Sequence, residues 1–499
     1  MKKIATLLFI TLSLGLFAQK NGHNIEIKIT DLANSQVMIA YHMQGKHYIS
    51  DTLEVNEKGI ALLKGDEPKE PGVYLCVFPS LQNKYFEFII REQNFSMEVA
   101  SGDIHNTLKF KNSEENELFY SDMGEMSTVR TQVEGLKAQI VNADEKRTKT
   151  LEDEINKLNK EYTDKRIKLA EDNPDFLYSA LLGMMREIKI PDAPVDEQGN
   201  IIDSTFQWKY YKHHFWDYTD FSNAGILRTP VFHGKMEDYI DKRTSPHPDS
   251  LAKSCDILLE KASANDDVFQ YVLVTLVNKF ANSKVMGQDG IYVHLVENYY
   301  NTGKAWWVEE DQLEKMKERV TALKPLLIDV TAPDLTLRDT SLAVKYRLHD
   351  LPHDYVIVFV WDPECGHCKK AMPALKAFYD KYKDKSVMVY AISTVNYENL
   401  GDWKDFVKEN NLDWLNVADP YNETNFRKIY DISSTPQLYI LDNEKTIVGK
   451  RIGTGQLEDF FYNYWKRNDP DKAIGMEKPT PHIHDHDGDG VPDHDDHAH

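Results

Sequence analysis

The chain has 499 residues, of which 41% are hydrophobic and 28% are charged. This composition is typical of folded globular protein rather than of disordered or membrane-spanning chains. The length exceeds what one hydrophobic core supports and suggests about three domains. Lysine and arginine total 59 against 80 aspartate and glutamate residues, so the formal net charge is −21. Nucleic acids and anionic lipid surfaces need a basic face, and the charge balance therefore argues against both as main partners.

The first residues have the pattern of an export signal. A short basic segment, residues 1–3, precedes an apolar run from Ile4 to Phe17. This run is shorter than the roughly 20 residues that span a membrane. We therefore expect residues 1–18 to be cleaved as a signal peptide, which leaves an exported protein without a transmembrane segment. The environment beyond the membrane is oxidising, and disulfide chemistry persists there.

Residues 22–112 are predicted to form a β-rich, sandwich-like domain. The stretch from Ile25 to Ile29 alternates apolar and polar side chains with a period of two, as a half-buried strand does. More short runs of this kind follow, separated by turn-forming clusters. Many short strands at close spacing are typical of a sandwich or a small barrel. No catalytic motif occurs in this part of the sequence, which favours a binding or packing role.

Residues 113–325 are predicted to be all-α. Apolar residues recur at steps of three and four between Met126 and Ile140, and the pattern resumes at Leu151. This coiled-coil-like start, residues 126–170, fits either a helical hairpin or one long helix with a stutter. Its many Glu and Lys residues fit a solvated face, and a dimerising coiled coil is the alternative. The pattern leaves the oligomeric state open.

Residues 326–467 alternate strand and helix patterns and are predicted to form an α/β domain. Buried strands are expected at 355–361 and 387–394, each followed by a helix. A hairpin with its turn at 442–445 and a last helix follow. Two parallel βα units and an antiparallel hairpin predict a mixed sheet covered on both faces. The predicted fold class is therefore multidomain: a β-rich sandwich-like domain, an all-α region and a C-terminal α/β domain.

The motif that carries chemistry is Cys365-Gly366-His367-Cys368, just after the strand that ends at Trp361. Cys365 is expected at a helix N-terminus, where unpaired backbone N–H groups and the helix dipole favour a thiolate. Cys368 lies one turn later on the same face and can form a disulfide with Cys365. We assign Cys365 as the attacking thiolate and Cys368 as the resolving thiol of a redox-active disulfide.

Charged neighbours are expected to tune this pair. A cationic His367 stabilises the Cys365 thiolate and with it the reduced dithiol, which makes the disulfide more oxidising. Lys369 and Lys370 act in the same direction, whereas Glu364 places an opposing negative charge beside the nucleophile. We expect a net lowering of the Cys365 pKa. A zinc site, the other common use of Cys-x-x-Cys, needs further ligands that the sequence does not offer at suitable spacing.

Two more cysteines lie outside this motif. Cys76 falls in an apolar run and Cys255 in a helical pattern, where cysteine commonly acts as a small buried hydrophobe. A disulfide between Cys76 and Cys255 is the alternative. Four cysteines are few for a secreted chain of this size, so disulfides are not expected to hold the fold together.

A second motif, Thr435-Pro436, ends a polar turn and leads straight into a strand, a place where a cis peptide bond is expected. Taken with the two cysteines, Trp361 and Pro373, this motif resembles the thioredoxin superfamily. The stretch 331–337 resembles the opening of its exported TlpA/ResA branch, and so does the added segment between Val395 and Thr424.

This resemblance implies a thioredoxin-like fold for residues 326–467 and thiol–disulfide oxidoreductase activity. It implies that Pro436 is cis and lies against the cysteines, that the Thr435 backbone pairs with a bound substrate peptide, and that Pro373 kinks the active-site helix. The expected partners are protein thiols or disulfides and a redox partner protein, with no cofactor beyond the Cys365–Cys368 disulfide. The expected location is the periplasm or cell envelope of a Gram-negative bacterium.

Cys-Gly-His-Cys is similar to the motif of protein disulfide isomerases, which implies a more oxidising poise than thioredoxin's Cys-Gly-Pro-Cys. Two positions depart from the family pattern. Thioredoxins carry a buried acid where this chain has Phe359, and ResA-like proteins carry a Glu where it has Ala371. His367 or water is the expected proton acceptor for Cys368 in their place.

The polar tail, residues 468–499, ends in a run rich in Asp and His. Its acids match the oxygen-ligand spacing of a calcium loop, although Asp replaces the final Glu and flanking helices are absent. A transition-metal site on the His residues and a solvated acidic tail are the alternatives. The candidate calcium ligands are Asp485, Asp487, Asp489, Asp493 and Asp496.

The leading hypothesis is an exported thiol–disulfide oxidoreductase that acts on protein disulfides. A thiol peroxidase on the same fold is one alternative, but it needs an isolated peroxidatic Cys with an Arg near it. The other alternative is a secreted binding or scaffold protein whose redox domain is an accessory.

Overall fold

The computed structural model describes residues 22–477, and the expected signal peptide lies outside this range. The chain divides into two compact units. The first runs to Pro246 and adds Lys253–Val272, and the second comprises His247–Ala252 and the chain from Leu273 onward. Among the helices of the described range, none combines the length and the apolar character needed to cross a membrane.

The first unit opens with two four-stranded sheets, in the orders β4-β1-β7-β8 and β3-β2-β5-β6. Strand β1 (His23–Ile29) buries every second side chain, including Ile25 and Ile27, because its two faces meet the core and solvent in turn. The predicted β-sandwich is confirmed. The other strands are β2 (Ser35–Met43), β3 (Lys46–Val55), β4 (Ile60–Gly65), β5 (Gly72–Phe78), β6 (Lys84–Ile90), β7 (Asn94–Val99) and β8 (Lys109–Lys111).

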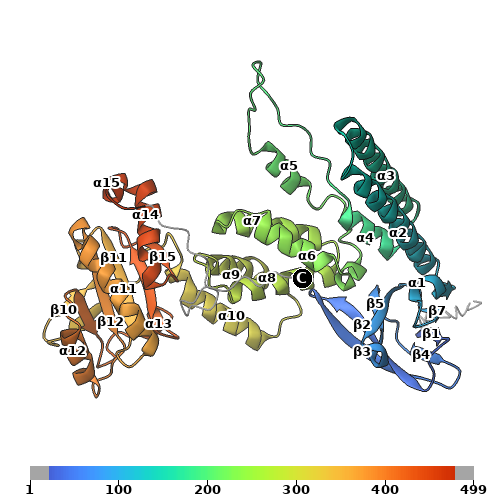
Figure 1. Cartoon of the computed structure of the whole chain (residues 1–499). Helices are drawn as coiled ribbons and strands as arrows, with labels where there is room; N and C mark the ends of the chain where they lie inside the picture. Colours follow the sequence, from blue (N-terminus) through green and yellow to red (C-terminus); the bar gives the residue numbers. More distant parts are fainter. Residues whose placement is uncertain (1–21, 478–499) are drawn as a thin grey trace, which may run out of the picture. The chain divides into compact units, whose positions relative to one another are not determined.

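A helical hairpin follows the sheets. Helices α2 (Glu114–Ile140) and α3 (Glu145–Asp172) pack along each other, as Figure 1 shows. The Asp144 side chain caps α3 by accepting a hydrogen bond from the Arg147 backbone N–H at 2.7 Å. The cap explains why a second helix begins there, and the chain therefore forms the hairpin rather than one long helix.

The rest of the central region is helical, as predicted. Cys255 is buried there and Cys76 is buried in the sandwich. Within residues 22–477 Cys76 forms no disulfide, so the alternative of a Cys76–Cys255 bridge is wrong. The main helices of the region are α4 (Leu177–Met185), α5 (Phe206–His214), α6 (Phe232–Glu237), α7 (Pro248–Ala262), α8 (Asp266–Ala281), α9 (Asp289–Leu295) and α10 (Glu310–Leu323).

The second unit is built on a seven-stranded mixed sheet in the order β10-β9-β13-β12-β11-β14-β15. Its central strand, β11 (Tyr355–Trp361), runs parallel to β12 (Val387–Ser393) and antiparallel to β14 (Gln437–Leu441). The other elements of this sheet and its helices are β9 (Thr336–Asp339), β10 (Lys345–Arg347), β13 (Leu415–Ala418), β15 (Ile447–Lys450), α11 (Gly366–Tyr382), α12 (Leu400–Glu409), α13 (Phe426–Ile429), α14 (Leu457–Asn468) and α15 (Pro470–Ala473).

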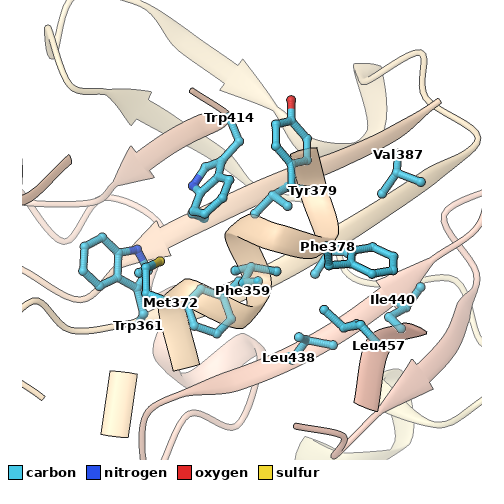
Figure 2. Packing of buried hydrophobic residues seen from close by; sticks show 14 of the residues in the cluster. Phe359, Trp361, Met372, Phe378, Tyr379, Val387, Trp414, Leu438, Ile440 and Leu457 are labelled. Atoms are coloured by element: carbon cyan, nitrogen blue, oxygen red, sulfur yellow. The ribbon is translucent and has the colours of Figure 1, made fainter. Parts of the chain in front are cut away.

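Every residue of β11 is buried because the sheet has a hydrophobic core on each face. Phe359 and Trp361 point into one core, where Figure 2 shows them with Phe378, Leu438 and Ile440. The intervening valines of β11 belong to the core on the other face. Burial on both faces accounts for the continuous apolar run in the sequence and confirms the predicted mixed sheet covered on both sides.

Two strands of the seven-stranded sheet were missing from the sequence prediction. β10 has three residues and β13 has four, so neither is long enough to show a period of two. β13 is held between β9 and β12, which come from distant parts of the sequence. Such strands form because of their partners and not because of a local pattern.

A buried ion pair ties β15 to α9 within the second unit. Lys450, 3% exposed, lies at the end of β15, and Asp289, 2% exposed, begins α9. The Lys450 Nζ is 2.5 Å from the Asp289 Oδ2, and it also donates to the Leu326 carbonyl. The Arg451 Nη2 lies 3.7 Å from the same Oδ2. Loss of the Asp289 charge would leave Lys450 buried without its anionic partner.

We predict that Asp289→Ala lowers the local free energy of opening by about 3–5 kcal/mol. Urea-dependent hydrogen exchange of the peptides that cover α9 and β15 measures this energy. The double variant Asp289→Leu/Lys450→Met should recover most of the loss, because an apolar pair leaves no buried charge.

The matched control is Glu423→Gln, which removes an exposed acid that pairs with Arg338 and Lys345 at 3.0 and 2.9 Å. It should cost far less than Asp289→Ala, because water screens the exposed pair. An Asp289→Ala effect as small as that of Glu423→Gln would contradict the importance of the buried pair.

Candidate active site

The site is built where the central strand ends. A turn of three residues follows β11, and Cys365 then caps α11 with an extended backbone at φ −71° and ψ 118°. The Cys368 backbone N–H donates to the Cys365 Sγ at 3.4 Å. The thiol thus occupies the capping position that a Ser or Asp oxygen usually fills, and it satisfies one of the open N–H groups of the helix.

The two thiols lie in different surroundings. Cys365 is partly exposed, whereas Cys368 is completely buried in the core beneath it. The Cys368 Sγ accepts a hydrogen bond from the Asp362 backbone N–H at 3.5 Å. Both cysteines are present as thiols. An accessible sulfur over a buried one is the arrangement that a dithiol needs to attack first with one thiol and resolve with the other.

The same surroundings move the two pKa values apart. Partial burial alone would raise the Cys365 pKa, but hydrogen bonds from the Cys368 thiol, the Cys368 backbone and the Thr435 side chain outweigh it, so the pKa lies below its ordinary value. Burial, together with the neighbouring Cys365, raises the Cys368 pKa to about 11. Cys365 is therefore the thiol that ionises first, which agrees with the expected lowering.

The second motif, Thr435-Pro436, lies beside Cys365, although Thr435 is 70 positions further along the sequence. The Cys365 thiol donates to the Thr435 carbonyl at 3.4 Å. The Thr435–Pro436 peptide bond is cis, as expected from the sequence. The turn before β14 thus brings Thr435 and Pro436 to the exposed sulfur.

Asp362 is a residue of the site that the sequence analysis did not single out. Its Oδ1 accepts from the Glu364 backbone N–H and its Oδ2 from the Thr394 hydroxyl, both at 2.8 Å. These bonds hold the turn so that the Asp362 N–H reaches the Cys368 sulfur. The available signal was an Asp-Pro dipeptide directly after a strand, which commonly starts a turn.

The charged neighbours of the cysteines are all exposed. The side chains of Glu364, His367, Lys369 and Lys370 lie at the surface, where solvent weakens their effect on the thiolate. His367 also acts through its backbone N–H, which lowers the Cys365 pKa. Phe359 is fully buried in the core and, like Ala371, offers no acid beside Cys368.

In the described range, 22–477, no group of three or more His, Cys, Asp or Glu side chains is placed to hold a metal ion. The candidate calcium ligands Asp485, Asp487, Asp489, Asp493 and Asp496 lie outside this range.

Three family models match successive parts of the chain. Residues 23–119 match a domain of unknown function, DUF4369, and residues 143–324 match another, DUF5106. Residues 328–450, which contain the dithiol, match the AhpC/TSA family.

Among curated proteins, the thiol-disulfide oxidoreductase ResA of Bacillus cereus is 30% identical over 122 residues, which cover 24% of this chain and 68% of that protein. The chain belongs to the ResA-like thiol-disulfide oxidoreductases of the thioredoxin superfamily. ResA of Bacillus subtilis is 26% identical over 148 residues, 29% of this chain and 77% of that protein. This ResA-like chain is thus an oxidoreductase, and its similarity to these two relatives covers less than a third of its length.

Solved structures include a domain of a possible thiol-disulfide isomerase from Cytophaga hutchinsonii. It is 39% identical, with a TM-score of 0.27, and the match covers 29% of the ResA-like chain and 96% of that domain. A thioredoxin-like protein from Bacteroides caccae is 20% identical, with a TM-score of 0.45, and the match covers 57% of this chain and 99% of that one.

The separated pKa values predict which cysteine reacts with an alkylating reagent. Cys365 should be modified first, and its rate should reach half of its maximum at a pH below the ordinary cysteine pKa, because its thiolate forms as the pH rises through the lowered value. Cys368 should stay unmodified until the pH approaches about 11. Mass spectrometry of the reduced chain after timed exposure to iodoacetamide across a pH series measures both rates.

Cys365→Ser and Cys368→Ser isolate the two thiols, and the buried Cys76 serves as an internal unreactive standard. Faster alkylation of Cys368 than of Cys365 in the unsubstituted chain would contradict the assignment.

Proposed function

We propose that the chain is an exported oxidoreductase that exchanges disulfides with protein substrates through Cys365 and Cys368. The observation that carries this proposal is the position of the Cys365 sulfur. It caps α11, is partly exposed, and contacts the carbonyl of Thr435 at the cis-proline turn. A substrate disulfide can approach an activated thiol there, with a second thiol beneath it.

In the reductive direction, the Cys365 thiolate attacks a substrate disulfide. A mixed disulfide forms between Cys365 and the substrate, and the other substrate sulfur leaves as a thiolate that takes up a proton. Cys368 loses its proton and attacks the Cys365 sulfur, which releases the second substrate thiol and forms the Cys365–Cys368 disulfide. Two electrons pass to the substrate, and the same steps in reverse oxidise a substrate dithiol.

The poise of the pair follows from the hydrogen bonds at Cys365. Groups that lower the Cys365 pKa stabilise the reduced form, which makes the disulfide a stronger oxidant. We therefore propose that the reduction potential of the Cys365–Cys368 disulfide is higher than that of thioredoxin. The resemblance of Cys-Gly-His-Cys to the motif of protein disulfide isomerases agrees with this.

Resolution by Cys368 is proposed as the slow step, because its pKa is raised to about 11 and neither Phe359 nor Ala371 supplies an acid. In this proposal the proton of Cys368 passes to water or to His367, the exposed second residue of α11. Pro436 and Thr435 orient the substrate chain beside Cys365.

Export to the periplasm or cell envelope is proposed from the signal-like pattern of residues 1–18 and from the oxidising environment that such chemistry needs. We also propose residues 22–112, 113–325 and 326–467 as separate domains, of which the last carries the redox activity.

Cys368→Ala should trap the mixed disulfide, because it removes the resolving thiol and leaves the attacking one. Incubated with a protein that contains one accessible disulfide, the full chain should form a stoichiometric covalent adduct at Cys365 that dithiothreitol releases. Non-reducing electrophoresis and peptide mapping identify the linkage. Cys365→Ala is the matched control and should form no adduct.

Two outcomes would contradict the proposal. Binding of the protein substrate without any thiol-dependent adduct favours a scaffold. Peroxide consumption that survives Cys368→Ser, without adduct formation, favours a thiol peroxidase of the kind that the AhpC/TSA family name suggests.

A further inference from the structure

A cleft of about 780 Å³ lies beside the redox pair within the second unit. One side comes from the thioredoxin-like domain and includes His367, Ala371 and Pro436. The other side comes from residues that precede that domain in the sequence, among them Ser283, Lys284 and Leu326. We call this space the composite cleft, because two sequence regions build it.

The wall that precedes the domain is fixed to the sheet by strong contacts. The buried Lys450–Asp289 pair joins β15 to α9, and both residues line the composite cleft. The next residue, Arg451, donates to the Ser283 carbonyl at 2.5 Å. A buried ion pair holds its partners in one geometry, so this wall is a built part of the site.

The composite cleft carries positive charge in an otherwise acidic chain. Four basic side chains line it, Lys284, Lys370, Lys450 and Arg451, against two acids, Asp289 and Asp431. Asp289 is engaged by Lys450 and lies 3.7 Å from the Arg451 guanidinium, which leaves Asp431 as the acid exposed in the lining. In the part of the chain that the structure describes, no ion pair is formed by the exposed Lys284 or by the exposed Lys370.

Two buried acceptors in the lining also point to a ligand. The Asp289 Oδ1 and the Gln437 Oε1 are buried and accept no hydrogen bond from any residue in the range 22–477. Buried acceptors are costly when they stay without a donor. An extended peptide brings a row of backbone N–H donors, which supplies what these oxygens lack.

We propose that the composite cleft selects protein substrates whose reacting cysteine is flanked by acidic residues. This inference rests on the proposed function, because the selected substrate is the one that reacts at Cys365. Carboxylates on the substrate would lie against Lys284, Lys370 and Arg451, while its backbone pairs with the free acceptors. Opposite charge raises the rate of encounter and aligns the cysteine with Cys365.

Attack by Cys365 on three activated peptides tests this directly. Each peptide carries one cysteine as its 2-pyridyl disulfide, flanked on both sides by Glu, Gln or Lys. The full-chain Cys368→Ala variant reacts once with each, and released 2-thiopyridone reports the second-order rate. Each rate is divided by the rate of the same peptide with 2-mercaptoethanol, which removes intrinsic differences in reactivity.

The normalised rate should follow Glu over Gln over Lys, with about a tenfold span at low salt that shrinks at high salt. Equal normalised rates for the three peptides would overturn the inference and leave the proposed function intact. The proposed function itself would be wrong if Cys368→Ala reacted with none of the three peptides faster than the Cys365→Ala/Cys368→Ala double variant does.

Lys284→Glu in the same background assigns the selectivity to the wall that precedes the domain. It should reduce the Glu-to-Lys ratio towards one. Lys315→Glu makes the same charge change on α10, outside the composite cleft, where Lys315 is exposed and pairs with Asp311. Lys315→Glu should keep the original ratio, and an equal fall in both variants would show that overall charge, and not the cleft, sets the preference.

Discussion

The hydrogen bond from the Cys368 backbone N–H to the Cys365 sulfur depends on where α11 begins, and the rest of the site follows from it. The helix starts at the end of β11, a strand that is buried along its whole length at the centre of the sheet. A strand with a core on each face cannot slide without exposing apolar side chains, so its end is a fixed point. The cap holds one sulfur at the surface and places the other beneath it.

The turn between strand and helix sets the surroundings of the buried thiol. The carboxylate of Asp362 is held by Glu364 and Thr394, and its backbone N–H is directed at the buried Cys368. A backbone N–H can stabilise the Cys368 thiolate but cannot accept the proton that the Cys368 thiol must lose. The site therefore combines an activated first thiol with a second thiol whose pKa is high, which supports the proposal that resolution by Cys368 is slow.

The sequence predicted the parts of this molecule that depend on local patterns. The alternation of β1, the wholly apolar β11, the Cys-x-x-Cys helix start and the cis bond before Pro436 all have signals within a few residues. Strands β10 and β13 do not, because their pairing partners are far away in the chain. The Lys450–Asp289 pair spans 161 positions, and neither residue stands in a motif. The composite cleft could therefore not be predicted from the sequence alone.

The activated thiolate is tested most directly by the equilibrium of the full chain with mixtures of reduced and oxidised glutathione, measured by alkylation and mass spectrometry. We predict one two-electron transition at Cys365 and Cys368, about 30 mV per tenfold change in the equilibrium constant, with a midpoint above thioredoxin's value of about −270 mV. Either Cys→Ser substitution should abolish it. A midpoint at or below about −270 mV would contradict the claim that the protein stabilises the Cys365 thiolate. A transition that persists in Cys365→Ser would show that Cys365 and Cys368 are not the redox pair.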